Sequence, residues 1–254
     1  LGSRMLTGLT EASVRIPRQD AMMSAGHVIL DDPLPNSSDP TFSNQSMTPK
    51  LVGAIAQLNL SAVLAQHPRI GNDYFASELR RALVQEVERV LLVGDNTGTP
   101  AEPDGLVNLA DNTNSLTIAT ATAIEDFNAA NKVYRDYTQG NDPMLTWVLP
   151  PELLEAMETQ PAFTGSGYPM SETLRAKGIR YVPALNLPET TGTYTGFVGN
   201  FSYHVHGLWQ AADIALNPWA DSVFASKATL FRVSMLHDYQ VIDSKRILQL
   251  AVTP

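Results

Sequence analysis

The chain has 254 residues, enough to bury a sizeable core in one large domain or two smaller ones. Its 17 Lys and Arg face 26 Asp and Glu, and the net charge of −9 argues against a protein that wraps nucleic acid with clustered basic residues. Cysteine is absent, which excludes disulfide scaffolds, thiolate nucleophiles and cysteine-ligated zinc.

The first fifty residues differ in character from the rest of the chain. Residues 1–21 form a polar N-terminal arm with one short alternating stretch that Pro17 closes. Residues 22–50 are rich in Asp, Pro, Ser and Asn. Compact domains rarely contain structureless loops longer than about 12–15 residues. We therefore expect a two-stranded flap that extends off the body, with a disordered surface loop as the alternative.

The clearest helical pattern lies between Asn72 and Val93. Asn72 is a favourable N-cap, Asp73 suits the positive end of the helix dipole, and Gly94 is a natural stop. The apolar stripe of helical period consists of Phe75, Leu79, Leu83, Val87, Val90 and Leu91. A long helix over 72–93 follows from this pattern.

Helices and strands then alternate without a regular repeat. A helix should begin at Thr122, and Pro150 and Pro151 should open another that Pro161 ends. Between and after them we predict a helix over 171–177 and strands over 146–149, 179–182, 196–208, 213–216 and 229–243, with 247–252 pairing with the long strand 229–243. This mixture favours an α+β class over a doubly wound sheet.

Two glycine-rich segments superficially suggest active-site loops. The turn at 94–99 lacks the Gly-Lys-Ser/Thr ending of a phosphate loop and follows a helix, not a strand. The segment 164–167 lacks the Gly-x-Ser-x-Gly pattern of a nucleophile elbow. Neither indicates catalysis.

The histidines near the C-terminus form the other candidate. His204 and His206 should share one face of a strand, a spacing that a metal site could use if Asp213 or His237 were brought near. We favour two half-buried strand histidines without a metal. His237 and Asp238 are adjacent in a strand, so their side chains point to opposite faces and cannot form a relay. We expect no catalytic, cofactor-binding or metal-binding residue.

Across about residues 9–252, the order of features resembles the major capsid proteins of tailed phages, the family typified by phage Hong Kong 97. In that family a long spine helix runs into a Gly-x-Gly/Asn-Thr-Gly turn and then a Pro-x-Gly-Ile/Leu motif. The stretches that carry the resemblance are 14–18, 39–50, the helix at 72–93 with Gly94-Asp95-Asn96-Thr97-Gly98 and Pro103-Asp104-Gly105-Leu106, and 215–219 with the strand 229–243.

The resemblance implies the α+β capsid fold of the Hong Kong 97 type. Its parts would be an N-terminal arm (1–21), an extended loop (22–50), a peripheral domain (51–120) with the spine helix at 72–93, a mainly axial domain (121–212) and strands that return to the peripheral domain (213–254). Such subunits form pentamers and hexamers of an icosahedral shell around double-stranded DNA, which the chain would contact weakly and without sequence preference.

The same resemblance implies partners and a location. A portal, a scaffold with its protease and decoration proteins would act with the shell, no membrane would be involved, and the protein would be made in the host bacterial cytoplasm and end in the virion. The alternatives are a cell-encoded, cargo-loading nanocompartment shell of the same fold and, more remotely, a soluble hydrolase that uses Ser166 or the His204/His206 pair.

Two expectations concern contacts between subunits. We expect the arm and the loop to lie over neighbouring subunits, through Arg15, Arg18, His27, Ile29, Leu30, Leu34 and Phe42. Some members cross-link subunits through a loop Lys, an Asn and a catalytic Glu. Residues 22–49 contain no Lys, and Arg232, Val233 and Ser234 stand about where the Glu would fall. We therefore predict no autocatalytic cross-linking.

Overall fold

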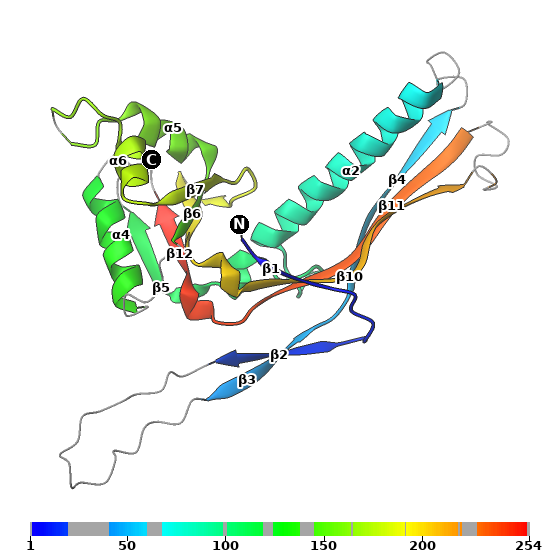
Figure 1. Cartoon of the computed structure of the whole chain (residues 1–254), viewed down its shortest axis with the longest axis horizontal. Helices are drawn as coiled ribbons and strands as arrows, with labels where there is room; N and C mark the ends of the chain where they lie inside the picture. Colours follow the sequence, from blue (N-terminus) through cyan, green and yellow to red (C-terminus); the bar gives the residue numbers. More distant parts are fainter. Residues whose placement is uncertain are drawn as a thin grey trace, which may run out of the picture.

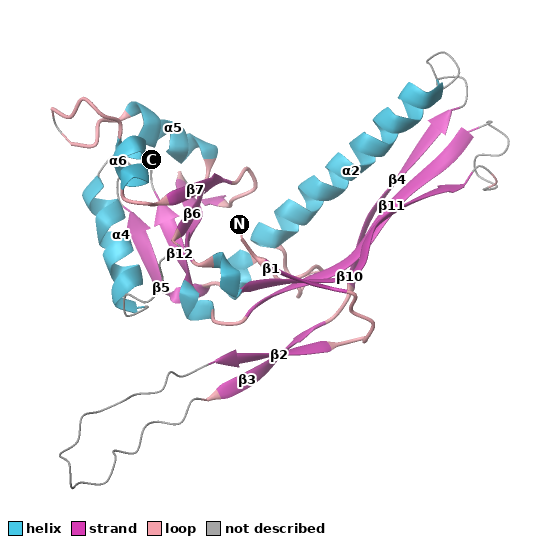
Figure 2. Ribbon diagram, in the orientation of Figure 1, coloured by secondary structure: helices cyan, strands magenta, loops and turns pink. Residues whose placement is uncertain are grey.

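Two β-sheets divide the chain into an elongated part and a compact part, and a separate hairpin leads away from both (Figures 1 and 2). The computed structural model describes residues 2–19, 41–59, 68–98, 101–118, 124–137, 145–163, 165–190, 192–217, 219 and 228–252. Helices and strands are intermixed along the chain, which confirms the predicted α+β class. No described helix is long and apolar enough to cross a membrane.

The elongated part is a four-stranded sheet with a helix along one face. The strands lie in the order β1 (Arg4–Thr7), β10 (His204–Asn217), β11 (Ala228–Val241) and β4 (Lys50–Asn59), with β1 parallel to β10 and the other pairs antiparallel. Helix α2 (Pro68–Val93) runs alongside β4 and β11 in Figure 1. Its apolar stripe packs on alternate residues of β11, and the buried members are Leu79, Leu83, Phe231, Val233 and Met235.

The spine helix is longer than the sequence pattern indicates. Its C-terminal end falls at Val93 as predicted, but the helix begins at Pro68, so the predicted N-cap at Asn72 is wrong. The backbone at Asn72 and Asp73 is already helical. Proline is well tolerated at the first helical position, because its missing N–H would have no partner there and its φ angle suits a helix.

The compact part is a six-stranded sheet covered by three helices. The sheet order is β5 (Asp111–Ile118), β12 (Ile247–Val252), β9 (Thr193–Gly199), β6 (Thr146–Leu149) and β7 (Arg180–Pro183), and β8 (Glu189–Thr190) pairs with β9. The helices are α4 (Ile124–Tyr137), α5 (Pro151–Thr159) and α6 (Met170–Ala176). Their buried faces meet the sheet in a core that includes Phe127, Tyr134, Trp147, Leu153, Met157 and Leu174.

The C-terminal strands correct two predictions. Residues 204–217 form one long strand in place of two short ones, and the segment before it splits into β9 and the 3₁₀ turn η1 (Phe201–Tyr203). Strand β12 pairs with β9 and β5 and not with β11, because the 3₁₀ turn η2 (Ser244–Arg246) redirects the chain into the other sheet. Hydrophobic alternation predicts a strand but does not identify its partner.

The predicted domain boundaries stay a prediction. Strand β5 comes from the segment assigned to the peripheral domain and β12 from the segment assigned to the return strands, yet both lie in the six-stranded sheet with β6, β7 and β9.

Candidate assembly surfaces

The hairpin that leads away from the body is the first candidate surface for contacts with other chains. Strands β2 (Val14–Gln19) and β3 (Phe42–Met47) pair only with each other in the described structure, from Val14 opposite Met47 to Gln19 opposite Phe42. Figure 1 shows the pair extending away from both sheets. A two-stranded hairpin alone is marginally stable in water, so its base must be held by the body.

An apolar contact holds the base of this hairpin. Ile16 and Met47 are buried against Val205 of β10, with Trp209 and Ile242 at the margin. Gly207 lies beneath Met47, and a Cβ atom at Gly207 would collide with the Met47 side-chain methyl group. The indole Nε1 of Trp209 donates a hydrogen bond to the Glu11 carbonyl oxygen (2.6 Å), which fixes the chain just before β2.

A buried carboxylate completes the anchor. Asp238 accepts a hydrogen bond from the Thr48 backbone N–H (2.8 Å), and Lys50 Nζ lies 3.4 Å from its other oxygen. Burial raises the pKa of Asp238, although the Thr48 amide and Lys50 both act in the opposite direction. Sequence reasoning missed this contact, because Asp238 and Thr48 are far apart in the chain and no local pattern connects them.

The residues predicted to contact neighbouring subunits fall into three groups. Arg15 is exposed on β2, and Phe42 is 64% exposed on β3, so both are accessible to another chain. Arg18 instead donates to Ser244 Oγ of the same chain (2.6 Å) and is only half-exposed. The other four, His27, Ile29, Leu30 and Leu34, lie outside the described residues, and their intersubunit role stays a prediction.

A second accessible surface is the face of the long sheet opposite α2. On β4, Val52, Ala54 and Ala56 pack toward the helix. The side chains between them point away, and Leu51 and Ile55 are 72% and 70% exposed. Arg232, Val233 and Ser234 stand on β11 about where the cross-linking Glu of some family members would fall. Arg232 is exposed, Val233 is buried and Ser234 is half-buried. No carboxylate occupies this stretch of β11, and the absence of cross-linking stays a prediction.

The turn after the spine helix has a structural role. The Gly94 carbonyl accepts hydrogen bonds from the Gly105 N–H (2.9 Å) and Asn108 Nδ2 (2.8 Å). Arg89 of α2 reaches across to Glu102 (2.6 Å). The chain then enters the short helix α3 (Leu106–Leu109), whose first residue is fully buried. These contacts account for the motif Pro103-Asp104-Gly105-Leu106 without a bound nucleotide.

The histidines gather around one tyrosine ring. His204 and His206 share a face of β10, as predicted, and the rings of His204, His206 and His237 lie 4.6–5.4 Å from that of Tyr239. We call these four residues the histidine cluster. Burial lowers the pKa of all three histidines, to about 3 for His204 and about 4 for His237.

The histidine cluster is mostly buried, and His204 Nε2, His206 Nε2 and His237 Nδ1 have no hydrogen-bond partner among the described residues. Tyr239 donates to the Val87 carbonyl of α2 (3.2 Å), and His204 Nδ1 lies 2.9 Å from Ser3 Oγ. Two residues were considered as further metal ligands beside His204 and His206. The ring of His237 contacts that of His206, whereas Asp213 is exposed. Asp238 points to the opposite face, toward Thr48, as expected for adjacent strand residues. Among the described residues, no group of His, Cys, Asp and Glu is arranged to hold a metal ion.

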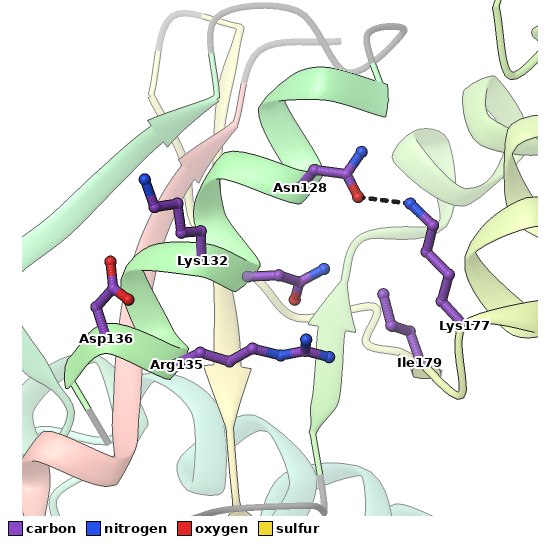
Figure 3. Close-up of a pocket in the computed structure, with 7 residues that line it drawn as sticks. Asn128, Lys132, Arg135, Asp136, Lys177 and Ile179 are labelled. Atoms are coloured by element: carbon purple, nitrogen blue, oxygen red, sulfur yellow. Dashed lines mark hydrogen bonds between the residues drawn. The ribbon is translucent and has the colours of Figure 1, made fainter. Parts of the chain in front are cut away.

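The compact part carries a pocket with a cavity volume of about 520 Å³ between α4 and the turn after α6. Figure 3 shows Lys132 and Arg135 on α4 and Lys177 across from them. Asp136 is the acidic member of the lining. The sequence offered only a weak signal for this pocket, the i, i+3 spacing of Lys132 and Arg135.

Comparisons with known proteins agree with this geometry. A model of the phage capsid family matches residues 1–252. Among solved structures, the chain is similar to one from Mycobacterium phage Bobi (TM-score 0.74, 14% identity, 100% of this chain and 88% of the other). It is also similar to chains from the capsid of an empty GTA particle (TM-score 0.73, 13% identity, 100% and 88%) and from Microbacterium phage Oxtober96 (TM-score 0.72, 13% identity, 100% and 89%). No curated protein matches the chain in sequence. At these identities the structural likeness establishes a shared fold.

Proposed function

The chain belongs to the phage capsid family, and we propose that it is the major capsid protein, which self-assembles into the pentamers and hexamers of an icosahedral phage head that encloses double-stranded DNA. The observation that carries the proposal is the family match over residues 1–252, joined to a fold that matches phage capsid chains over the whole length of this one. The role is structural, and its chemistry is that of non-covalent contact.

The architecture suits a subunit that works through many modest contacts. The β2–β3 hairpin extends beyond the body, and the outer face of β4 offers exposed Leu51 and Ile55. Closed symmetry multiplies each such contact over the particle, so no single interface needs to be large. We include in the proposal that the segment 22–49 lies over a neighbouring subunit.

The remaining partners follow from the same proposal. Packaged DNA would touch the shell weakly, since the chain carries a net charge of −9. A portal, a scaffold with its protease and decoration proteins would join the shell at defined stages. Synthesis would take place in the host bacterial cytoplasm, and the finished protein would reside in the virion.

Electron microscopy of the purified full-length chain tests the proposal. Negatively stained samples should show closed shells or rings, and particles from infected cells should contain DNA and a portal. A chain that stays monomeric at all concentrations would contradict the proposal. Shells filled with an enzyme and lacking DNA would instead identify a cell-encoded nanocompartment.

Deleting residues 30–45 tests the role of the extended segment. Because the deletion also removes residues 42–45 of β3, the shortened subunit should keep the helical part of its circular dichroism spectrum and lose most of its particle yield. An unchanged yield would remove this segment from the proposed interface.

A further inference from the structure

The pocket on the compact part gathers positive charge in an otherwise acidic chain. Among the described residues that line it, Lys132, Arg135 and Lys177 are positively charged and Asp136 is negatively charged. All four side chains are exposed, and Figure 3 shows the Arg135 guanidinium group on the side of α4 that faces Lys177. The lining therefore offers several hydrogen-bond donors to a negatively charged group.

Two hydrogen bonds fix the shape of this pocket. Lys177 Nζ donates to Asn128 Oδ1 (2.8 Å), which ties the turn after α6 to α4. Asn131 is only 7% exposed, and its Oδ1 accepts from Trp147 Nε1 (3.3 Å) in the core. The cations are thus held on a rigid base, and little ordering is required when a partner binds.

The same compact part carries a matching acidic face. Glu152, Glu155 and Glu158 are exposed on α5, while Leu153 and Met157 bury the opposite side of this helix in the core. Within the described part of the chain, no Lys or Arg forms an ion pair with these three glutamates. Three carboxylates therefore stand in solvent without a partner from the described residues of their own chain.

The two faces also match in length. At a rise of about 1.5 Å per residue, the step from Glu152 to Glu158 covers about 9 Å along α5. The step from Asn128, where Lys177 is bound, to Arg135 covers about 10 Å along α4. Lys132 and Arg135 on α4, with Lys177 held at Asn128, thus cover nearly the same length as the three carboxylates on α5.

We propose that the acidic face of α5 on one copy of the chain binds the basic pocket of α4 and Lys177 on a neighbouring copy. The inference rests on the proposed assembly into pentamers and hexamers. The two faces differ, so the contact is head-to-tail, the kind that closes into a ring when the rotation fits. Figure 1 shows α4 and α5 along different edges of the compact part, which allows each copy to use both faces at once.

Charge reversal on each face tests the contact. The pocket variant is Lys132→Glu with Arg135→Glu, and the helix variant is Glu155→Lys with Glu158→Lys. Each should lower shell yield at least tenfold in 0.1 M salt while the circular dichroism spectrum of the unassembled subunit stays unchanged. The variant that combines all four substitutions should restore yield to within about threefold of the original chain.

A matched control separates pairing from net charge. Adding Glu11→Lys and Glu78→Lys to the pocket variant gives the same net charge as the fourfold variant but leaves α5 unchanged. This control should not restore assembly. Recovery as complete as in the fourfold variant would overturn the inference.

Mixing the two double variants gives a test that depends on ring size. Pocket and helix variants can alternate around a six-membered ring with opposite charges at every junction, so an equimolar mixture should recover hexamers. A five-membered ring keeps at least one junction of like charge, so pentamers should remain depleted. Equal recovery of both rings, or of neither, would contradict the head-to-tail contact.

The outcomes distinguish this inference from the proposed function. An original chain that forms no shells or rings would overturn both. Full assembly of the original chain and of both double variants would overturn the α4–α5 contact alone. Normal shells with reduced DNA content in the pocket variant would assign the pocket to DNA and would equally overturn the contact.

Discussion

Replacing Asp238 with alanine should loosen the base of the β2–β3 hairpin. The carboxylate accepts the Thr48 N–H at 2.8 Å and faces Lys50 Nζ at 3.4 Å, and the residue is only 4% exposed. Alanine leaves the Thr48 N–H and the mostly buried Lys50 ammonium group without this acceptor. A buried donor without a partner costs about 1–3 kcal/mol. We therefore expect Asp238→Ala to lower the free energy of unfolding by about 2 kcal/mol, mostly through the loss of the partner of Lys50.

Asparagine at the same position should cost much less. Burial raises the pKa of Asp238, so the native environment disfavours the charged form despite its partners. A folded-state pKa above the unfolded value means that this group contributes stability at acid pH and loses it as the pH rises through the folded pKa. The Asp238→Asn substitution would keep an acceptor for the Thr48 N–H without burying a charge, at a cost of about 1 kcal/mol.

Two measurements check this reasoning. Urea unfolding of the unassembled subunit gives the free energies, and hydrogen exchange reports on Thr48 and on the strands 14–19 and 42–47. Asp238→Ala should speed exchange in both strands, while exchange in β12 should change only as far as global stability does. A loss below about 1 kcal/mol for alanine, or equal losses for alanine and asparagine, would refute the argument.

Four further predictions concern the histidine cluster, the spine helix, the turn after it and the finished particle. Burial lowers the pKa of His204 to about 3 and that of His237 to about 4. The neutral histidines therefore contribute stability above their ordinary pKa of 6.5, and this contribution is lost as the pH falls below it. Urea unfolding between pH 7 and 4.5 should show a loss of at least about 2 kcal/mol from these groups, and a flat profile would contradict the assignment. Phe231→Ala opens a cavity beneath α2 and should cost about 3–4 kcal/mol in urea unfolding, whereas Arg232→Ala, on the exposed face, should cost less than about 0.5 kcal/mol. Gly94→Ala places a Cβ against the Pro103 and Val90 carbonyl oxygens and should lower the thermal midpoint by several degrees, whereas Gly167→Ala meets open space and should leave it nearly unchanged. Denaturing electrophoresis of mature particles should give a monomer band, and a covalent ladder would show that cross-linking occurs.

Local sequence signals predicted elements well where the pattern was both periodic and bounded. The strand Thr146–Leu149 and the C-terminal end of the spine helix at Val93 agree with the structure, because Pro150 follows the strand and Gly94 follows the helix. The predicted start of the spine helix is wrong by four residues. The sequence offers both Asn72 as an N-cap and Pro68 as a first helical residue, and the helix begins at Pro68.

The candidate surfaces were predicted less completely. Exposed Arg15 and Phe42 agree with a projecting hairpin, whereas Arg18 is engaged by Ser244, 226 residues further along the chain. The basic pocket was missed because Lys177 joins α4 only through tertiary packing, by its hydrogen bond to Asn128.

The sequence by itself determined the class of the protein. The order of the motifs around the spine helix resembles that of phage capsid proteins, and this resemblance pointed to a structural capsid subunit, because such turn motifs are local features of the sequence. The absence of cysteine excluded cysteine-based scaffolds and active sites. Only the tertiary structure decided which strands are neighbours. Strand β12 has the same alternation whether it pairs with β11 or with β9, and the 3₁₀ turn at Ser244–Arg246 sends it to β9. Long-range contacts also decided which charges face one another, since the anchor at Asp238 and the pocket at α4 are each built from segments distant in the chain.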